Sequence, residues 1–224
     1  MRGWHRPVAA GLLALAAWSL AGLGALAGPP VPTMSQRAQP WSRQALGSDP
    51  VDTIGSSGCA LTAVTMVATA YGYQTTPAQL NQWLTHHGGY IENDLLLWRQ
   101  ATAVTQGSVR WQWLHVPGMV SQLRTDDQDI EDLPPQSLVE AQLDAGRLVV
   151  AEVRLYGGMH FVVITGHRGD ILYINDPWYG DRTTLQARYG SYQRPSTRRR
   201  STTATRSCVG QAAASSSSYS AGPH

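Results

Sequence analysis

The stretch Ile54–Tyr71 (IGSSGCALTAVTMVATAY) predicts a Gly/Ser turn that places Cys59 in the first turn of a buried helix. Glycine and serine before Cys59 suit a tight turn and a helix N-cap, and apolar residues then recur at helical spacing. Only Thr62, Thr65 and Thr69 form a polar stripe, so this helix belongs in the centre of a domain. The partial positive charge at a helix N-terminus favours a thiolate over a thiol. We therefore interpret Cys59 as a nucleophile; a buried structural cysteine is the alternative.

Residues 1–27 have the pattern of a secretory signal peptide. Basic residues precede an apolar run from Val8 to Leu26, and Ala25-Leu26-Ala27 is a small-x-small cleavage sequence. An uncleaved membrane anchor is the alternative, but the run is short and rich in alanine and glycine. The sequence therefore predicts a secreted or extracytoplasmic protein that has no contact with the membrane after signal cleavage.

Residues 195–224 differ from the rest of the chain, because they are rich in Ser, Thr, Arg, Ala and Gly and nearly devoid of large apolar residues. This composition predicts a disordered tail, and a reading-frame change near the end of the gene would give the same pattern. The second cysteine, Cys208, lies in this tail. Export would permit a disulfide with Cys59, but nothing in the tail would hold Cys208 close to it. We expect Cys59 to be unpaired and reactive.

The charge of the expected domain gives no reason to predict a nucleic-acid partner. The whole chain has a formal net charge of +2, but its signal and tail contain six of the 17 basic residues. Residues 28–194 therefore hold 11 arginines against 15 acidic residues, a net of −4, and the chain has no lysine. A mildly acidic domain does not attract a polyanion. We expect a monomer that acts on a peptide or protein.

The order of the expected elements predicts an α+β fold. A linker over residues 28–35 leads into a domain of residues 36–194, in which helices come first and strands follow. Thr76 and Pro77 are the N-cap and first residue of one helix, and Glu92 or Asn93 starts another. The expected strands are 108–116, 148–155, 160–165, 171–175 and 183–187. The strand over 160–165 is apolar on both faces, which indicates a central position. A helical half should therefore face an antiparallel sheet half.

His160 and Asp176 lie on the two arms of an expected hairpin. If the hairpin turns about residue 168, His160 stands directly opposite Asp176, with Cα atoms about 5 Å apart. A carboxylate at that distance can hold an imidazole in one tautomer. Taken singly, His160 could be a strand-edge residue and Asp176 a turn residue. Together with Cys59, they form the set that thiol hydrolysis needs.

Four segments resemble the bacteriocin-processing peptidase family, whose members are papain-like cysteine peptidases. They are Gln36–Trp41, Gly58–Thr62, His160–Gly166 and Tyr173–Pro177, and the resemblance covers about residues 34–192. The resemblance implies a papain-like fold in which Cys59 is the nucleophile, His160 the general base and Asp176 the group that orients His160. It also implies that Gln36 and the backbone N–H of Cys59 bind the oxyanion. Gln44 is the rival of Gln36 for that role.

These observations predict an exported cysteine peptidase-like hydrolase that cleaves a peptide or isopeptide bond through an acyl-thioester intermediate. A cell-wall peptide amidase and a non-enzymatic exported binding module on the same fold are the alternatives. The sequence has no transporter segment, so the cleavage of double-glycine leader peptides is not carried over from the family. We expect no cofactor, and no metal site either, because the histidines lack the paired Cys/His spacing of metal ligands.

Overall fold

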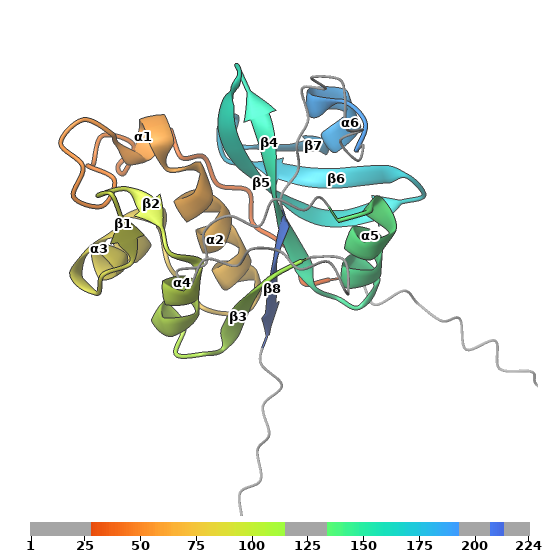
Figure 1. The fold of residues 1–224 in the computed structure, drawn as a ribbon, viewed down its shortest axis with the longest axis horizontal. Coiled ribbons are helices and arrows are strands. Elements are labelled where there is room, and N and C mark those ends of the chain that lie inside the picture. The colour runs from red at the N-terminus through yellow and green to blue at the C-terminus, as the bar shows by residue number, and fades with distance from the viewer. Residues whose placement is uncertain (1–27, 115–133, 193–206, 213–224) are drawn as a thin grey trace, which may run out of the picture.

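The computed structural model describes residues 28–114, 134–192 and 207–212 (Figure 1). These residues form a mixed helix and sheet structure whose strand pairs are all antiparallel, as the α+β prediction requires. None of the helices in these ranges has the length and apolar character that a membrane span needs. The predicted signal peptide lies outside the described residues.

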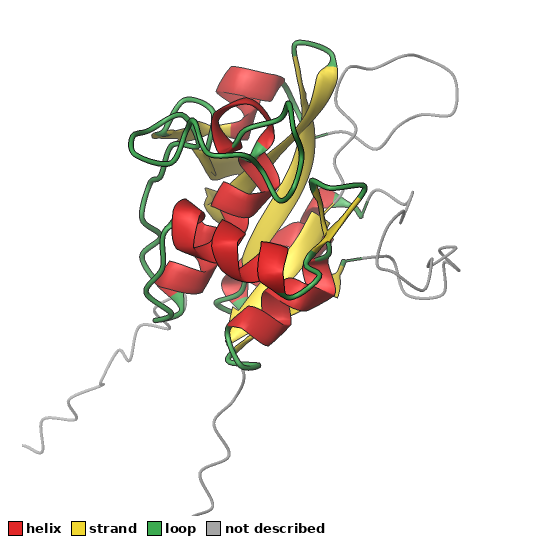
Figure 2. Cartoon of the chain, turned by 90° about the vertical axis from the view of Figure 1, so that its left-hand side faces the viewer, coloured by secondary structure: helices red, strands yellow, loops and turns green. Residues whose placement is uncertain are grey.

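The first half of the chain forms helices on one side of the molecule. These are α1 (Ile54–Ser57), α2 (Cys59–Ala70), α3 (Pro77–His86) and α4 (Trp98–Val104), together with a small hairpin of β1 (Tyr90–Ile91) and β2 (Leu95–Leu96). Figure 2, which views the molecule from this side, shows the helices in front of the sheet strands. The predicted start of α3 is confirmed, because the side chain of Thr76 accepts a hydrogen bond from Gln79 N. Helix α2 is buried along most of its length, as its sequence predicted.

The second half builds most of a six-stranded sheet with the order β3-β8-β4-β5-β6-β7. Its strands are β3 (Val109–Trp113), β4 (Leu148–Leu155), β5 (Gly158–Arg168), β6 (Ile171–Asp176), β7 (Asp181–Thr184) and β8 (Ser207–Ala212). Two further helices, α5 (Gln136–Asp144) and α6 (Leu185–Tyr189), pack against β4, β5 and β6. Strand β5 is central, as predicted.

The sheet separates two apolar cores. Helix α2 packs against β5 in the first core, to which β4 and β5 contribute Leu148, Val150, Phe161 and Val163. Alternate residues of the same strands belong to the second core, together with residues of α5 and α6 such as Val139 and Leu185. Because successive strand residues point to opposite faces, an apolar run such as Phe161–Ile164 suits a strand covered on both sides. The sheet is therefore a fixed platform between the two helical layers.

The segment 28–35, predicted to be a linker, packs against this platform. Val31 is 5% exposed, and its carbonyl oxygen accepts hydrogen bonds from Asn175 Nδ2 at 3.1 Å and Arg182 Nη2 at 3.4 Å. Polar side chains of β6 and β7 thus bind the backbone of a segment whose composition alone suggested a connection. The assignment of residues 28–35 as a linker stays a prediction.

Strand β8 lies within the tail that we expected to be disordered. Its Cys208 pairs with Trp113 of β3 on one side and with Val150 of β4 on the other. Backbone hydrogen bonds make these pairs, and they do not require apolar side chains, which explains why composition did not predict them. The rest of the tail lies outside the described residues. The boundaries of the predicted signal, domain and tail stay predictions.

Two local expectations also differ from the structure. Glu92 and Asn93 have φ angles of 49° and 76°, so they form the turn between β1 and β2 instead of starting a helix. The expected strand over residues 183–187 ends at Thr184, whose side chain accepts from Ala187 N and caps α6. In both places, a residue with turn or helix-cap geometry ends the helical or strand pattern earlier than the sequence predicts.

Candidate active site

A compact turn delivers Cys59 to the start of α2. Thr53 and Ser56 form a capping box at α1, in which each side chain binds the backbone N–H of the other residue. Gly58 then links α1 to α2, and a Cβ atom at this position would lie 2.5 Å from the carbonyl oxygen of Ile54. The close approach of the two helices therefore requires glycine before the cysteine.

Cys59 is the first residue of α2 and is 9% exposed. Its Sγ lies 3.9 Å from the carbonyl oxygen of Ser57. Gly58, the N-cap, has no side chain that could cap α2, and the first N–H groups of a helix have no partner within the helix. A negative charge on Sγ is favoured at such a position, because the helix dipole and these N–H groups both attract it.

The hairpin of β5 and β6 brings His160 and Asp176 together, but in a different register from the one we predicted. The strands pair Val163 with Asn175, and a bulge between Ile164 and Gly166 shifts the rest of the ladder by one residue. The hairpin turns at Gly169 and Asp170, not at residue 168. His160 therefore meets Asp176 diagonally instead of directly across the pair, a distance that a long side chain can span.

His160 and Asp176 form a buried hydrogen-bonded pair. Nε2 of His160 lies 2.9 Å from Oδ1 of Asp176, and the two residues are 2% and 0% exposed. The backbone N–H of Trp178 donates to the same oxygen at 2.9 Å. Cys59 lies close enough to His160 to raise the pKa of the imidazole. Because Nε2 faces Asp176, the other ring nitrogen, Nδ1, is left for the thiol.

The environment of His160 favours the imidazolium. Burial alone lowers its pKa, but the hydrogen bonds to Asp176 and Cys59 and the charges of both groups outweigh burial and raise the pKa to about 9. Because folding raises the pKa of His160 from 6.5 to about 9, the protonated imidazole stabilises the folded state. This contribution is complete below pH 6.5 and is lost as the pH rises through 9. At neutral pH, the arrangement therefore favours a protonated imidazole beside the thiol.

Asp176 is held as a carboxylate. Burial opposes its ionisation, but hydrogen bonds from His160, Tyr189 and the backbone of Trp178 keep its pKa below the usual value. A carboxylate in this state can accept from Nε2–H and fix the tautomer of the imidazole. Tyr189 lies on α6, in a part of the chain where the sequence had indicated no site residue.

Gln36 lies beside this set of residues. Its backbone N–H donates to Pro177 O at 2.8 Å, next to Asp176, and its Nε2 donates to Gly55 O at 3.1 Å, in the turn that precedes Cys59. The residue is 1% exposed, and its Oε1 has no hydrogen-bond partner among the described residues. Gln36 thus bridges the segment that carries Cys59 and the segment that carries Asp176.

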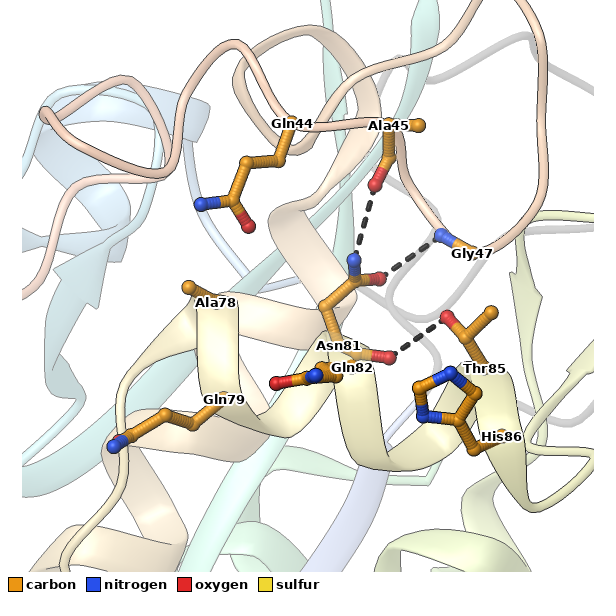
Figure 3. A pocket seen from close by; sticks show the side chains of 9 residues that line it. All are labelled: Gln44, Ala45, Gly47, Ala78, Gln79, Asn81, Gln82, Thr85 and His86. Carbon is orange, nitrogen blue, oxygen red and sulfur yellow. Dashed lines mark hydrogen bonds between the residues drawn. The ribbon is translucent and has the colours of Figure 1, made fainter.

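Gln44 lies elsewhere. It is exposed and lines a pocket of about 380 Å³ between its own loop and α3 (Figure 3). Figure 3 shows Asn81 in this pocket, where its amide binds Gly47 N and Ala45 O at 2.9 and 3.0 Å. Neither Cys59 nor His160 belongs to the lining.

Among the described residues, no group of three or more His, Cys, Asp and Glu side chains is placed to hold a metal ion. The chemistry available here is that of a thiol near an imidazole, which is itself hydrogen-bonded to a carboxylate. Such a set can make a nucleophile, transfer its proton and hold the base in place.

The fold and these side chains are those of a cysteine peptidase-like α+β protein. The sequence model of the Peptidase_C39 like family matches residues 30–198, which is most of the chain, and the chain therefore belongs to this family. A search among curated proteins gave no match. The family agrees with the resemblance seen in the sequence, and it supports a peptidase of the cysteine type.

Proposed function

We propose that this protein is an exported hydrolase that cleaves a peptide or isopeptide bond with Cys59 as nucleophile. The observation that carries the proposal is the buried His160–Asp176 hydrogen bond close to Cys59, which lies at the N-terminus of a buried helix. Membership of the Peptidase_C39 like family supports the reaction class. The signal-peptide pattern of residues 1–27 supports export, with the mature chain acting alone outside the cytoplasm.

The proposed reaction has two halves. In the first, the Cys59 thiolate attacks the carbonyl carbon, and the imidazolium of His160 gives its proton to the leaving amine as the C–N bond breaks. This step leaves an acyl-thioester on Cys59. In the second half, neutral His160 takes a proton from a water molecule, whose oxygen attacks the thioester carbonyl. The carboxylic acid product leaves, and the thiolate and imidazolium are restored.

Gln36 and the backbone N–H of Cys59 are the proposed donors to the oxyanion. A glutamine amide has two N–H groups, and the bond to Gly55 O uses one of them. Since the oxyanion forms only during reaction, these donors act on turnover and not on the thiol.

We expect Gln36→Ala to lower kcat by roughly 10²- to 10³-fold and to leave the alkylation rate of Cys59 unchanged, as for the loss of one oxyanion donor. Gln44→Ala is the matched control, because it removes the rival amide from the pocket beside α3. Steady-state kinetics on both variants decide the assignment. If Gln44→Ala shows the loss and Gln36→Ala does not, Gln44 is the donor.

The proposed substrate is an extended polypeptide. Large side chains that are exposed to solvent lie next to the site, namely Tyr156 at 82%, Met159 at 53% and Tyr179 at 45%. Met159 precedes His160, and Tyr156 forms a T-shaped contact with Trp178, whose backbone binds Asp176. Exposed aromatic side chains beside catalytic groups suit contact with the side chains of a peptide.

The proposal is tested by incubating the mature protein with an unfolded protein and, separately, with purified peptidoglycan. Mass spectrometry of the products shows which bond is cut, and Cys59→Ala is the inactive control. New peptide termini from the unfolded protein support a peptidase. Release of peptides from peptidoglycan alone would establish the cell-wall amidase. Cleavage of neither substrate, with no difference between parent and Cys59→Ala, would favour a binding module and contradict the proposal.

A further inference from the structure

The second carboxylate oxygen of Asp176 has partners that the reaction described above does not use. Oδ1 faces His160, whereas Oδ2 accepts a hydrogen bond from Tyr189 Oη at 2.6 Å and another from Arg188 Nη1 at 3.2 Å. Both donors come from α6, the last helix of the described domain. Asp176 itself is 0% exposed, so these side chains take the place that water would have around an exposed carboxylate.

Other contacts fix Arg188 in this position. Its Nη1 and Nη2 donate to the two carboxylate oxygens of Asp181 at 2.6 and 2.9 Å. Its guanidinium also lies 4.1 Å from the ring centroid of Tyr179, in a cation–π contact. These contacts fix the plane of the guanidinium, so that Nη1 stays directed toward Asp176. The flexible ammonium of a lysine would be held less firmly in that direction.

We propose that Tyr189 and Arg188 are positioning residues that keep Asp176 ionised and hold its Oδ1 toward His160. This inference rests on the proposed function for its meaning in catalysis. A buried carboxylate without donors is destabilised as an anion, and it can also rotate so that either oxygen faces the imidazole. With Oδ2 bound by two donors, the rotation is blocked and the anion is compensated.

The pKa directions agree with this geometry. Burial acts against ionisation of Asp176, while the hydrogen bonds from His160 and Tyr189 lower its pKa. The pKa of Arg188 is raised, chiefly by its hydrogen bond to Asp181, so the guanidinium stays charged. Neither helix α6 nor its role could be read from the sequence pattern, in which Arg188 and Tyr189 follow an expected strand.

The test uses Tyr189→Phe, which removes one hydroxyl and keeps the ring. We expect turnover to fall roughly tenfold with KM unchanged, because a hydrogen bond to a charged group is lost. We expect the proton between His160 Nε2 and Asp176 Oδ1 to give a strongly downfield proton NMR signal, which is assigned by its absence in His160→Ala. We expect this signal to shift upfield or broaden in Tyr189→Phe.

Tyr192→Phe is the matched control, because the hydroxyl of Tyr192 also donates a hydrogen bond of 2.6 Å, but to Pro134 O instead of Asp176. This variant should keep both the NMR signal and the turnover of the parent. A second pair, Arg188→Gln and Arg188→Lys, tests the charge: the glutamine variant should weaken the signal, and the lysine variant should retain more of it.

The outcomes separate this inference from the proposed function. If the parent cleaves no substrate, yet the downfield signal changes in Tyr189→Phe and not in Tyr192→Phe, the positioning role stands and the hydrolase proposal fails. If Tyr189→Phe and Arg188→Gln both keep the signal and turnover of the parent, the positioning role is wrong. An equal change in Tyr192→Phe would also overturn it, because the signal would then follow general stability.

Discussion

His160→Ala is expected to abolish both hydrolysis and the rapid alkylation of Cys59. The substitution removes the proton donor for the leaving amine and the positive charge that stabilises the thiolate. His160 is also the group that lies between Asp176 and the thiol, so its loss separates the carboxylate from Cys59. Turnover and the rate of carboxymethylation by iodoacetamide measure the two effects, and circular dichroism establishes that the variant is folded.

His167→Ala provides a matched control on the same strand. His167 bonds to Asp144 with the same 2.9 Å separation that joins His160 to Asp176, but it is partly exposed and Cys59 is not one of its partners. In the His167→Ala variant, Cys59 should be alkylated and substrate should be hydrolysed at the rates of the parent. A His160→Ala variant that keeps parental alkylation would show that Cys59 does not depend on an imidazole.

Asp176→Asn is expected to lower turnover by several orders of magnitude while the chain still folds. An amide has the size of the carboxylate and can accept from Nε2–H, but it can also present its NH₂ group and so select the wrong tautomer. It cannot compensate the charge of the imidazolium. We expect alkylation of Cys59 to be reduced but detectable, because the helix N-terminus still favours the thiolate. The measurements are kcat and the alkylation rate at neutral pH.

Asp144→Asn is the control for this prediction, because it removes the carboxylate from the surface pair with His167. It should change neither quantity. If Asp176→Asn retains the turnover of the parent, Asp176 is a structural residue and the assignment of three coupled groups fails.

Local signals in the sequence predicted the elements that position the nucleophile. The apolar content of Ile54–Tyr71 indicated a buried helix, and the Gly58-Cys59 pair marked its start. Thr76 and Pro77 likewise predicted the start of α3, because helix capping depends only on residues within one turn. The structure brings Cys59, His160 and Asp176 together, and their catalytic roles stay predictions.

Features that depend on distant partners were not predictable from the same patterns. The register of the β5–β6 hairpin differs from the predicted one, and a bulge near Thr165 shifts it within the hairpin. A bulge of this kind has no reliable local signal in the sequence. The packing of Val31 depends on Asn175, and strand β8 depends on the open edges of β3 and β4. In each case, a segment with an uninformative composition finds backbone or polar partners that only the fold supplies.

The donors on α6 illustrate the same limit within the site. Arg188 and Tyr189 are 12 and 13 residues from Asp176, and nothing in that spacing indicates a hydrogen bond. The contact forms because β7 ends at Thr184, which caps α6 and turns it back over β6. A sequence pattern that predicted a strand here necessarily missed both side chains.

The rate of Cys59 alkylation as a function of pH tests the central claim most directly, which is that Cys59 and His160 form a thiolate–imidazolium pair. The full chain is treated with iodoacetamide between pH 5 and 10, in native buffer and in urea, and peptide mass spectrometry separates Cys59 from Cys208. Because the pKa of His160 is raised to about 9, the imidazolium should be present across neutral pH. Its charge and the N-terminus of α2 both favour the thiolate of Cys59. The account predicts that native Cys59 reacts at nearly the same rate from pH 6 to 8, and at pH 6 at least about tenfold faster than in urea, where a free thiol has a pKa of about 8.5. A native rate that rises with pH in parallel with the unfolded chain would contradict it.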